Sequence, residues 1–291
     1  MKSLLVLPLL AACGGSTPEP TVEPAPEPAA EAPAPVAEPA PDAEPSAALA
    51  AALSHEARTD DDKARDTQRR PVATLAFFDV QPDSRVLELW PGGGWYSHIL
   101  SPYLSAGGGH LVVTHYDTAA EPAYRGRHAT AWKEYIDQYG VQDSTTTVVI
   151  EDSIPEFEGI EPVDTVLTFR NVHNWVAADI DADIYKHAFH ILKPGGTFGV
   201  VEHRAAPGTT REQSADSGYM DQQAVIDAIT AVGFEFVESS EINANPLDTK
   251  DHPEGVWTLP PSFALDDVDR DKYAAIGESD RMTLKFRRPA E

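Results

Sequence analysis

Cysteine is almost absent from this chain: its 291 residues include one, Cys13. A single thiol cannot form a disulfide within one chain, so a fold held together by disulfides is excluded. Basic residues are also scarce, with 22 Lys and Arg against 47 Asp and Glu, which gives a formal net charge of −25. Binding to a nucleic-acid backbone needs clustered Lys and Arg, so we expect no nucleic-acid partner.

The first thirteen residues have the pattern of a bacterial export signal. Lys2 is followed by an apolar run from Leu4 to Leu10, which is too short to span a bilayer but suits the core of a signal peptide. The stretch 10–13, Leu-Ala-Ala-Cys, resembles a lipobox, which implies cleavage before Cys13 and lipidation of that residue. Gly14 follows instead of aspartate, so by analogy we expect an outer-membrane anchor that faces the periplasm. The alternatives are an uncleaved leader or a chance match.

Residues 14–53 are rich in Pro, Ala and Glu. Prolines recur from Pro18 to Pro45 and prevent a helix, and the glutamates repel one another. We therefore predict a disordered, extended tether. The chain then divides into a signal peptide over 1–13, this tether over 14–53 and a folded domain over 54–291.

The folded domain alternates strand patterns with helical ones. We expect strands at 85–90, 110–114, 145–150, 163–169, 197–201, 234–237 and 282–286. We expect helices at 54–78 with an interruption at Pro71, and at 95–104, 124–139, 180–192 and 220–232. This alternation predicts an α/β fold with a mostly parallel sheet covered by helices on both faces. Only irregular sequence joins the last two strands, which favours an antiparallel pairing between them.

The glycine-rich turn after the first of these strands is the most informative feature. Glu88 lies near the end of the strand, and Gly92, Gly93 and Gly94 separate it from a helix. Glycines let a ligand approach the backbone closely, and the helix N-terminus lies open behind them. We expect the turn to cradle an adenosine-type cofactor and Glu88 to accept hydrogen bonds from its backbone N–H groups. The alternative is a purely structural turn.

Residues 54–288 resemble the class I S-adenosylmethionine-dependent methyltransferases. The resemblance rests on the glycine-rich turn, on Asp117 after the second strand, on 151–153 after the third, and on 192–196 before the fifth. More narrowly, the chain resembles a group of bacterial predicted methyltransferases in five stretches, 90–96, 170–175, 201–204, 251–257 and 277–282. The resemblance implies a Rossmann-like, seven-stranded methyltransferase sheet, mostly parallel with the last strand antiparallel, and S-adenosyl-L-methionine as cofactor.

The resemblance also implies cofactor-binding residues. Asp117 would bind the ribose hydroxyls through its two acceptor oxygens, with His115 as a rival if the second strand ends at Thr114. Asp152 and Ser153 would receive the adenine amino group, or else cap a helix.

Two further residues bear on the cofactor. Asn171, just past the fourth strand, is expected beside it. Trp90 departs from the family pattern because it occupies the first glycine position of the turn. It either crowds the methionine end of the cofactor or shifts the turn slightly and leaves binding intact. We favour intact binding because the narrower group shares the variant.

Candidate catalytic residues follow the fourth and fifth strands, at the edge where open α/β sheets bind ligands. Histidine exchanges protons near neutral pH, so His173 is our candidate general base and His203 a second one. Asn174 would orient a substrate. The alternative for each is a residue in a hydrogen-bonded structural network.

The histidines and an acidic residue raise two further possibilities, a metal site and a loop that closes a pocket. His115, His173, Glu202 and His203 match no standard zinc spacing, so we expect no metal. His252 lies in the long segment after the sixth strand, where it would either help to close a pocket or belong to a packed turn.

Two functions of different classes follow. The first is a lipid-anchored enzyme that transfers a methyl group from S-adenosylmethionine to a small-molecule or cell-envelope substrate. The second is a binding or scaffold lipoprotein that reuses the fold, because the cofactor is made in the cytoplasm and the expected location lies outside it. A third, weaker reading is non-methylating chemistry at the sulfonium. We favour the enzyme, with the lipid anchor as its sole membrane contact and no obligate protein partner evident.

Overall fold

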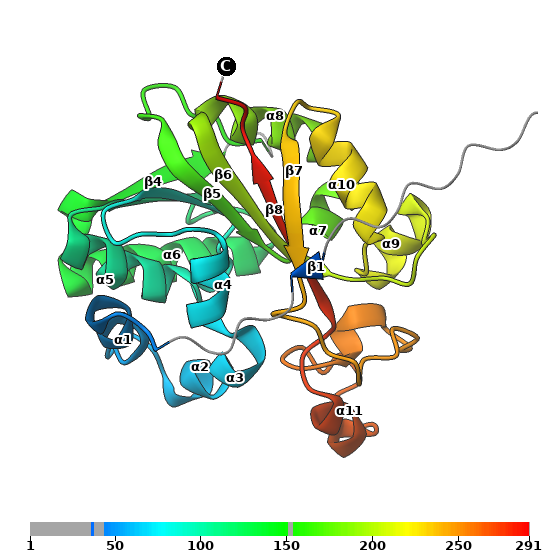
Figure 1. The fold of residues 1–291 in the computed structure, drawn as a ribbon. Coiled ribbons are helices and arrows are strands. Elements are labelled where there is room, and N and C mark those ends of the chain that lie inside the picture. Colours follow the sequence, from blue (N-terminus) through cyan, green and yellow to red (C-terminus); the bar gives the residue numbers. More distant parts are fainter. Residues whose placement is uncertain (1–35, 38–43, 151–153, 291) are drawn as a thin grey trace, which may run out of the picture. The chain divides into compact units, whose positions relative to one another are not determined.

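A computed structural model describes residues 36–37, 44–150 and 154–290. Their strands form one sheet in the order β1-β7-β8-β6-β5-β2-β3-β4 (Figure 1). The strands are β1 (Val36–Ala37), β2 (Arg85–Leu89), β3 (His110–Tyr116), β4 (Thr145–Ile150), β5 (Val163–Phe169), β6 (Leu192–His203), β7 (Glu235–Ser240) and β8 (Arg281–Arg287). The seven predicted strands are all present, and the two-residue β1 adds an eighth at the β7 edge.

The sheet is parallel except at β8. This strand runs antiparallel to both of its neighbours, β6 and β7. The remaining pairs are parallel, including β2 with β3 and β2 with β5. The predicted Rossmann-like methyltransferase sheet is therefore confirmed. After β4 the chain crosses to the other side of β2, so the point between β2 and β5 is where such sheets bind ligands at their carboxyl edge.

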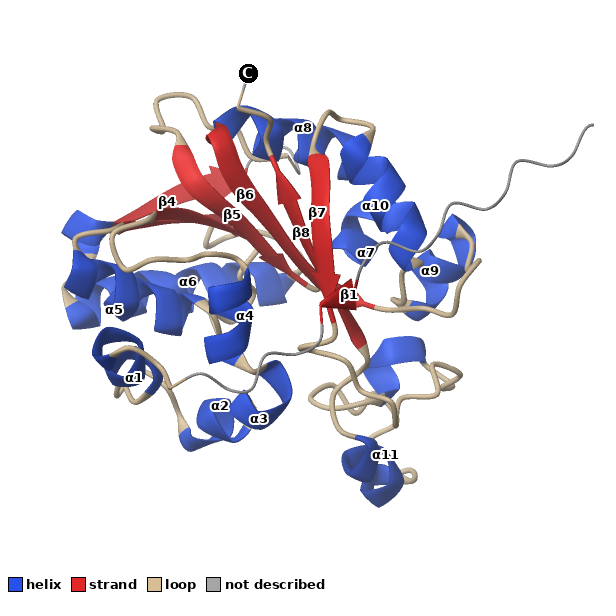
Figure 2. Cartoon of the chain, viewed as in Figure 1, coloured by secondary structure: helices blue, strands red, loops and turns tan. Residues whose placement is uncertain are grey.

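Helices cover both faces of the sheet, as predicted (Figure 2). They are α1 (Ala47–Leu53), α2 (Asp60–Ala64), α3 (Asp66–Arg69), α4 (Pro71–Phe77), α5 (Ser97–Gly107), α6 (Ala123–Tyr139), α7 (Val172–Ala177), α8 (Asp181–Ile191), α9 (Arg211–Ser217), α10 (Gln222–Thr230) and α11 (Arg270–Ile276). One apolar core lies under α7, α8 and α10, and the other under α1, α4, α5 and α6. Among the described residues, no helix is both long enough and apolar enough to span a membrane.

The two cores follow from the alternation of side chains along each strand. On β2, Leu87 belongs to the first core and Val86 to the second, and on β3 Val112 belongs to the first core and Leu111 to the second. Successive side chains of a strand point to opposite faces, so a buried strand contributes to both cores. This explains why both strands contain a run of consecutive apolar residues, 86–87 in β2 and 111–113 in β3.

The folded domain begins earlier than predicted. The sequence suggested a tether up to residue 53 and a domain from residue 54. Helix α1 lies within the predicted tether, and the Ser46 hydroxyl caps it by accepting a hydrogen bond from the Leu49 N–H at 3.2 Å. Leu49 and Ala52 are buried in the second core. The prolines stop at Pro45, and the alanines that follow favour a helix. The signal peptide, Cys13 and most of the tether lie outside the described residues.

The helical stretch predicted over 54–78 has the expected interruption before Pro71, but it is divided further and does not begin at residue 54. Three short helices, α2, α3 and α4, take its place, and the first begins with a capping box at Thr59 and Asp62. Arg70 has a φ of 39°, outside the right-handed helical region. A residue before proline is disfavoured in that region, and Pro71 follows.

Candidate functional site

Two neighbouring cavities lie along the carboxyl edge of the sheet. The first, of about 270 Å³, is bounded by the glycine turn, the end of β3 and α7, and we call it the β3 cavity. The second, of about 420 Å³, is bounded by α2, α3, α7 and the segment 256–262, and we call it the arginine cavity. Both are lined by Trp90, Pro91, Gly92, Asn171 and Asn174. The two cavities therefore adjoin at these residues.

The glycine turn presents bare backbone to these cavities. Gly92 and Gly94 have φ values of 60° and 79°, in the left-handed region that favours glycine. A Cβ atom added at Gly92 or Gly93 would meet nothing within 4 Å. The turn thus leaves open the space that a cofactor would need.

Trp90 forms a wall between the cavities. Its backbone adopts the glycine-like φ of 49°, and its N–H donates to Thr114 Oγ1 at 2.8 Å. Its ring Nε1–H donates to the Tyr116 hydroxyl at 2.9 Å, and its ring lies 5.2 Å from that of Trp175. The tryptophan is fixed at the side of the β3 cavity, and the turn keeps its shape.

Glu88 does not bind the turn in the way the sequence suggested. Its carboxylate is buried and accepts a hydrogen bond from the Ser97 hydroxyl on α5 at 2.6 Å. Burial raises the pKa of Glu88 to about 7. Glu88 lines neither cavity. It fastens α5 to β2 behind the turn.

Asp117 is not brought into the site, and its rival His115 is. Strand β3 continues to Tyr116, two residues past its predicted end, so Asp117 lies on an exposed loop where its carboxylate accepts from the Ala119 N–H at 2.8 Å. His115 and Tyr116 line the β3 cavity. His115 is 5% exposed, and its Nε2 has no partner among the described residues. Burial, and then His128, lower the pKa of His115 to about 4.

His173 is paired with a buried carboxylate. Its Nδ1 lies 3.0 Å from Glu202 Oε1, and Glu202 is fully buried. The same carboxylate accepts from the backbone N–H groups of His173 at 3.3 Å and His203 at 2.8 Å. A carboxylate that accepts the Nδ1 proton leaves the Nε2 lone pair free. His173 lines the arginine cavity, where that lone pair would meet a ligand.

His203 lies beside His173, with ring centroids 5.3 Å apart. Its Nδ1 contacts the Ser279 hydroxyl at 2.5 Å, and it also lines the arginine cavity. Burial and the neighbouring His173 and arginines hold the pKa of His203 well below its usual value. His203 is therefore neutral, and it is suited to hydrogen bonding with a ligand.

The histidines and Glu202 also form a candidate metal group. In the described part of the chain, His173, Glu202 and His203 are the three residues whose ligand atoms all lie within 4.8 Å of one another. However, Glu202 already accepts hydrogen bonds from both neighbours. That arrangement favours orientation of His173 by Glu202, and the absence of a metal stays a prediction.

The asparagines lie where the two cavities meet. Asn171 donates from Nδ2 to the carbonyls of Leu89 and Trp90 at 3.0 and 3.2 Å, and so ties the end of β5 to the glycine turn. Asn174 is exposed on α7 and faces both cavities. Asp152 and Ser153 lie outside the described residues, as does Cys13.

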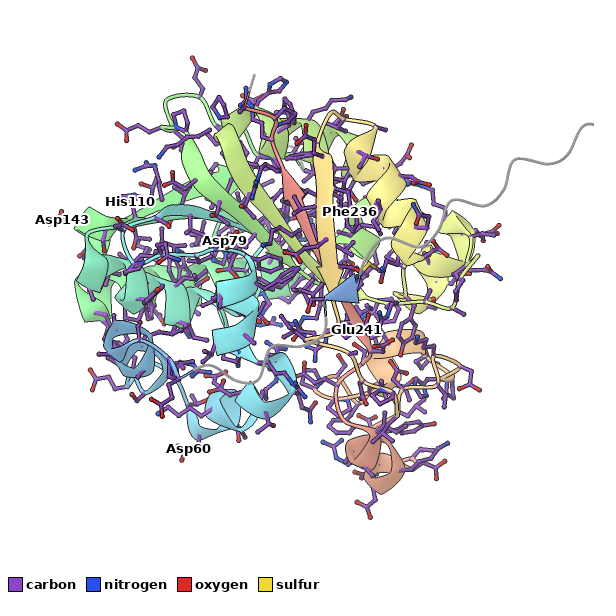
Figure 3. The ribbon with its side chains drawn as sticks, viewed as in Figure 1. Asp60, Asp79, His110, Asp143, Phe236 and Glu241 are labelled. Atoms are coloured by element: carbon purple, nitrogen blue, oxygen red, sulfur yellow. The ribbon has the colours of Figure 1, made fainter. Side chains whose placement is uncertain are left out.

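Two residues from the stretches that carry the narrower resemblance, His252 in 251–257 and Arg204 in 201–204, have structural roles. His252 contacts buried Asp248 through Nε2 at 2.8 Å and does not line the arginine cavity, although Trp257 from the same segment does. Arg204 forms paired contacts with Glu241 and Asp280. Figure 3 labels Glu241, which directly follows β7.

The charged wall of the arginine cavity was not predicted from the sequence. Its charged residues are Asp62, Arg65, Arg69, Arg170 and Glu278, and Ser279 lies beside them. Arg65 and Arg69 are four residues apart, a spacing that places two helical side chains on one face. Nothing in their sequence linked them to Arg170 or to Glu278, because the fold alone brings these segments together.

Comparison with protein-family models and with curated proteins gives no match. Among solved structures, a methyltransferase from Aquifex aeolicus that depends on S-adenosylmethionine is 14% identical, covers 78% of this chain and 94% of its own, and has a TM-score of 0.50. The chain has the fold of these methyltransferases. A protein from Galdieria sulphuraria assigned as a sarcosine dimethylglycine methyltransferase matches at 14% identity and a TM-score of 0.51, over 79% of this chain and 88% of that one.

The same fold also carries other chemistry. The cyclase SpnF matches at 15% identity and a TM-score of 0.51, over 77% of this chain and 82% of its own. At such identities the likeness establishes the architecture, and the function has to be argued from the site.

Proposed function

We propose that the chain is an S-adenosylmethionine-dependent methyltransferase, with the cofactor in the β3 cavity and a small acceptor molecule in the arginine cavity. The observation that carries this proposal is that the two cavities meet at Gly92 while His173, oriented by Glu202, faces the second. The cofactor would supply an electrophilic methyl group at this junction. Methyl transfer needs in-line placement and, for many acceptors, a base nearby.

The described residues of the β3 cavity fit an adenosine-type cofactor. Gly92 lines this cavity, and its lack of a side chain leaves the approach to the backbone open. His115 offers a buried and neutral ring nitrogen that has no partner among the described residues and can bond to a ribose or a base. Trp90 and Tyr116 provide aromatic surface against which a planar base can pack.

The side chains of the arginine cavity would act on the acceptor. His173 would take a proton from a hydroxyl, an amine or an acidic carbon through Nε2, while Glu202 holds the ring in place. Asn174, at the junction of the cavities, would orient the acceptor. Trp257, with its ring 6.0 Å from that of His173, would help to exclude water.

The test is a titration of S-adenosylmethionine and S-adenosylhomocysteine into the purified chain. We expect binding, and we expect Ala178→Leu to weaken it by about tenfold or more, because Ala178 lines the β3 cavity and the larger side chain would take up space there. Ala178 has a φ of −89°, so the substitution does not strain the backbone. Ala106→Leu, at an exposed position on α5, is the matched control.

A folded chain that binds neither compound would overturn the enzyme proposal. That result would favour the alternative of a binding or scaffold protein that reuses the fold. Equal binding by the parent chain and by Ala178→Leu would show that the cofactor binds outside the β3 cavity.

We also propose that the chain is a lipoprotein of the bacterial cell envelope, anchored in the outer membrane and facing the periplasm. The support is the lipobox-like stretch 10–13 and the Pro, Ala and Glu-rich segment behind it. In this proposal the acceptor is a small molecule or an envelope component, with no nucleic-acid partner and no obligate protein partner.

A further inference from the structure

We propose that the arginine cavity recognises a small acceptor that carries an anionic group, a carboxylate or a phosphate, held by Arg170 and Arg69 beside the two histidines. This inference rests on the proposed function for the role of the bound molecule as methyl acceptor. The anion site itself rests on the charges, contacts and burial of the cavity wall.

The positive charges of this wall outnumber the negative ones. Arg65, Arg69 and Arg170 line the cavity, and Arg281 lies behind it. Glu278 faces these four guanidinium groups, with contacts of 2.7 Å to Arg65 Nε, 3.1 Å to Arg69 Nε and 3.0 Å to Arg281 Nη1. One carboxylate thus forms ion pairs with three arginines.

The second acidic residue of the wall is occupied elsewhere. The Asp62 carboxylate accepts from the backbone N–H of Thr59 at 3.0 Å and from its hydroxyl at 2.8 Å, because it belongs to the capping box of α2. It makes no ion pair with an arginine of the cavity within the described residues. Asp62 still carries its charge, but the three arginines that line the cavity outnumber the two carboxylates, and the wall keeps a surplus of positive charge.

Arg170 is the arginine that the folded chain leaves without a partner. No hydrogen bond or ion pair of its guanidinium is formed within the described residues, although the group lines the cavity. It follows β5 directly, with a φ of 62°. A guanidinium carries five N–H donors in a planar fork that matches a carboxylate or a phosphate. Arg170 thus presents an open two-pronged donor to a ligand.

Arg69 adds a desolvated charge. It is 2% exposed, and its guanidinium carbon lies 4.7 Å from the centre of the Trp95 ring. Burial, and then Arg170, lower the pKa of Arg69 to about 8. Burying a charge is unfavourable unless it is paired, so an anion in the cavity would stabilise both arginines.

A structural network is the alternative explanation, and it accounts for part of the wall. The contacts of Arg65, Arg69 and Arg281 with Glu278 join α2 and α3 to the segment before β8. Such a network does not explain Arg170, which shares the cavity and contributes no contact to it. It also does not explain why the surplus charge faces His173 and His203.

The geometry restricts the acceptor. The anionic group would bind at Arg170 and Arg69, and the atom to be methylated would have to reach His173 Nε2 and the junction at Gly92. The cavity is also lined by Val256, Trp257 and residues 260–262, which suits the apolar part of a small organic molecule. We therefore expect a small organic acid or a phosphate ester whose nucleophilic atom lies close to its charged group.

The experiment is a titration of inorganic phosphate and, separately, of benzoate into the full chain, with and without S-adenosylhomocysteine. We expect at least one of the two anions to bind, and Arg170→Gln to weaken that binding about ten- to a hundredfold. Arg170→Lys should lose less, because the charge stays while the fork is lost. Arg127→Gln, at an exposed position of α6, is the matched control and should leave binding unchanged.

The outcomes separate this inference from the proposed function. S-adenosylhomocysteine should bind Arg170→Gln as it binds the parent chain, which also shows that the variant is folded. Anion binding without cofactor binding would overturn the methyltransferase and keep the anion site. A chain that binds the cofactor but neither anion, or anion binding that Arg170→Gln leaves intact, would overturn the anion site.

Discussion

Two buried carboxyl groups near the site show how neighbours decide the ionisation of a side chain. Glu88 has one hydrogen bond, from Ser97, and burial raises its pKa to about 7. Burial also acts to raise the pKa of Glu278, but Arg69, Arg281 and the other guanidinium groups lower it to about 2. Glu278 is consequently a fixed charge of the arginine cavity, whereas Glu88 gains a proton near neutral pH.

Replacing Glu88 by glutamine should change how stability depends on pH. The pKa of Glu88 rises from 4.5 in the unfolded chain to about 7 in the folded one, so the folded state holds the extra proton between these values. Its contribution is therefore fully present below pH 4.5 and is lost as the pH rises to about 7, by roughly 3 kcal/mol. We expect Glu88→Gln to gain stability relative to the parent over this window and to stay level above it.

The measurement for this prediction is urea unfolding of both chains at pH 4.5, 6, 7 and 8. Glutamine keeps an oxygen that can accept from Ser97, so the comparison isolates the charge. Glu134→Gln, at an exposed position of α6, is the control and should show no such trend. A constant difference between parent and Glu88→Gln at all pH values would contradict the assignment.

Single residues also explain why the site was only partly predictable from the sequence. Glycines at Gly92–Gly94 and the strand before them signalled a ligand-binding turn through local chemistry, and the structure places that turn on two cavities. The hydrogen-bond partner of Glu88 could not be predicted. The N–H groups of the turn and the Ser97 hydroxyl are all close to Glu88 in the sequence, and only the fold shows that Ser97 is the donor. Arg170 was visible in the sequence, but its lack of a partner is a property of the folded chain.

At the scale of elements, strand boundaries decided which residues reach the site. Strand β3 runs two residues further than its apolar pattern indicated, because His115 and Tyr116 pair with Val149 and Ile150 of β4. As a result, His115 lines the β3 cavity and Asp117 does not. The mostly parallel pairing, in contrast, followed from the alternation of strands and helices, because a crossover connection between parallel strands usually contains a helix.

Helix α1 gives a test of where the folded domain starts. Leu49 is 7% exposed and packs in the second core, so Leu49→Ala should lower the free energy of unfolding by about 2–4 kcal/mol. Leu247, which is 61% exposed, provides the matched control, and Leu247→Ala should change it by less than about 0.5 kcal/mol. Chemical denaturation of both variants measures the difference.

The outcome discriminates between two descriptions of residues 47–53. If residues 47–53 form a packed helix, Leu49→Ala lowers the free energy of unfolding. If a disordered tether reaches residue 53, Leu49→Ala changes it as little as Leu247→Ala does. Equal stabilities of the two variants would therefore show that residues 47–53 belong to the disordered tether.

For the whole molecule, the distribution of charge sets the arginine cavity apart. The chain carries a net charge of −25, yet three arginines line this one cavity. At physiological ionic strength, charges more than about 8 Å apart are largely screened, so the local arginines dominate what an anion meets inside the cavity. An acidic exterior with a basic cavity selects small anions that can enter it and disfavours nucleic acids, which cannot.

The cellular location is a property of the full chain, and Cys13 is the residue that tests it. If the stretch 10–13 acts as a lipobox, cells fed a radiolabelled fatty acid should incorporate label into the parent protein, and Cys13→Ser should abolish this incorporation, because the serine hydroxyl does not replace the thiol. Cys13→Ser should also shift the protein from the membrane fraction to the soluble fraction.

Gly14→Asp is the companion variant, because by the lipoprotein analogy an aspartate after the cysteine retains the protein in the inner membrane. It should keep the label and change the membrane in which the protein is found. Label that persists in Cys13→Ser would contradict lipidation at this residue. With lipidation confirmed and S-adenosylmethionine bound, the anchored domain would depend on a cofactor made on the other side of the inner membrane. If lipidation is absent and the protein is found in the cytoplasmic fraction, the cofactor is available to it and the argument from location for a scaffold disappears.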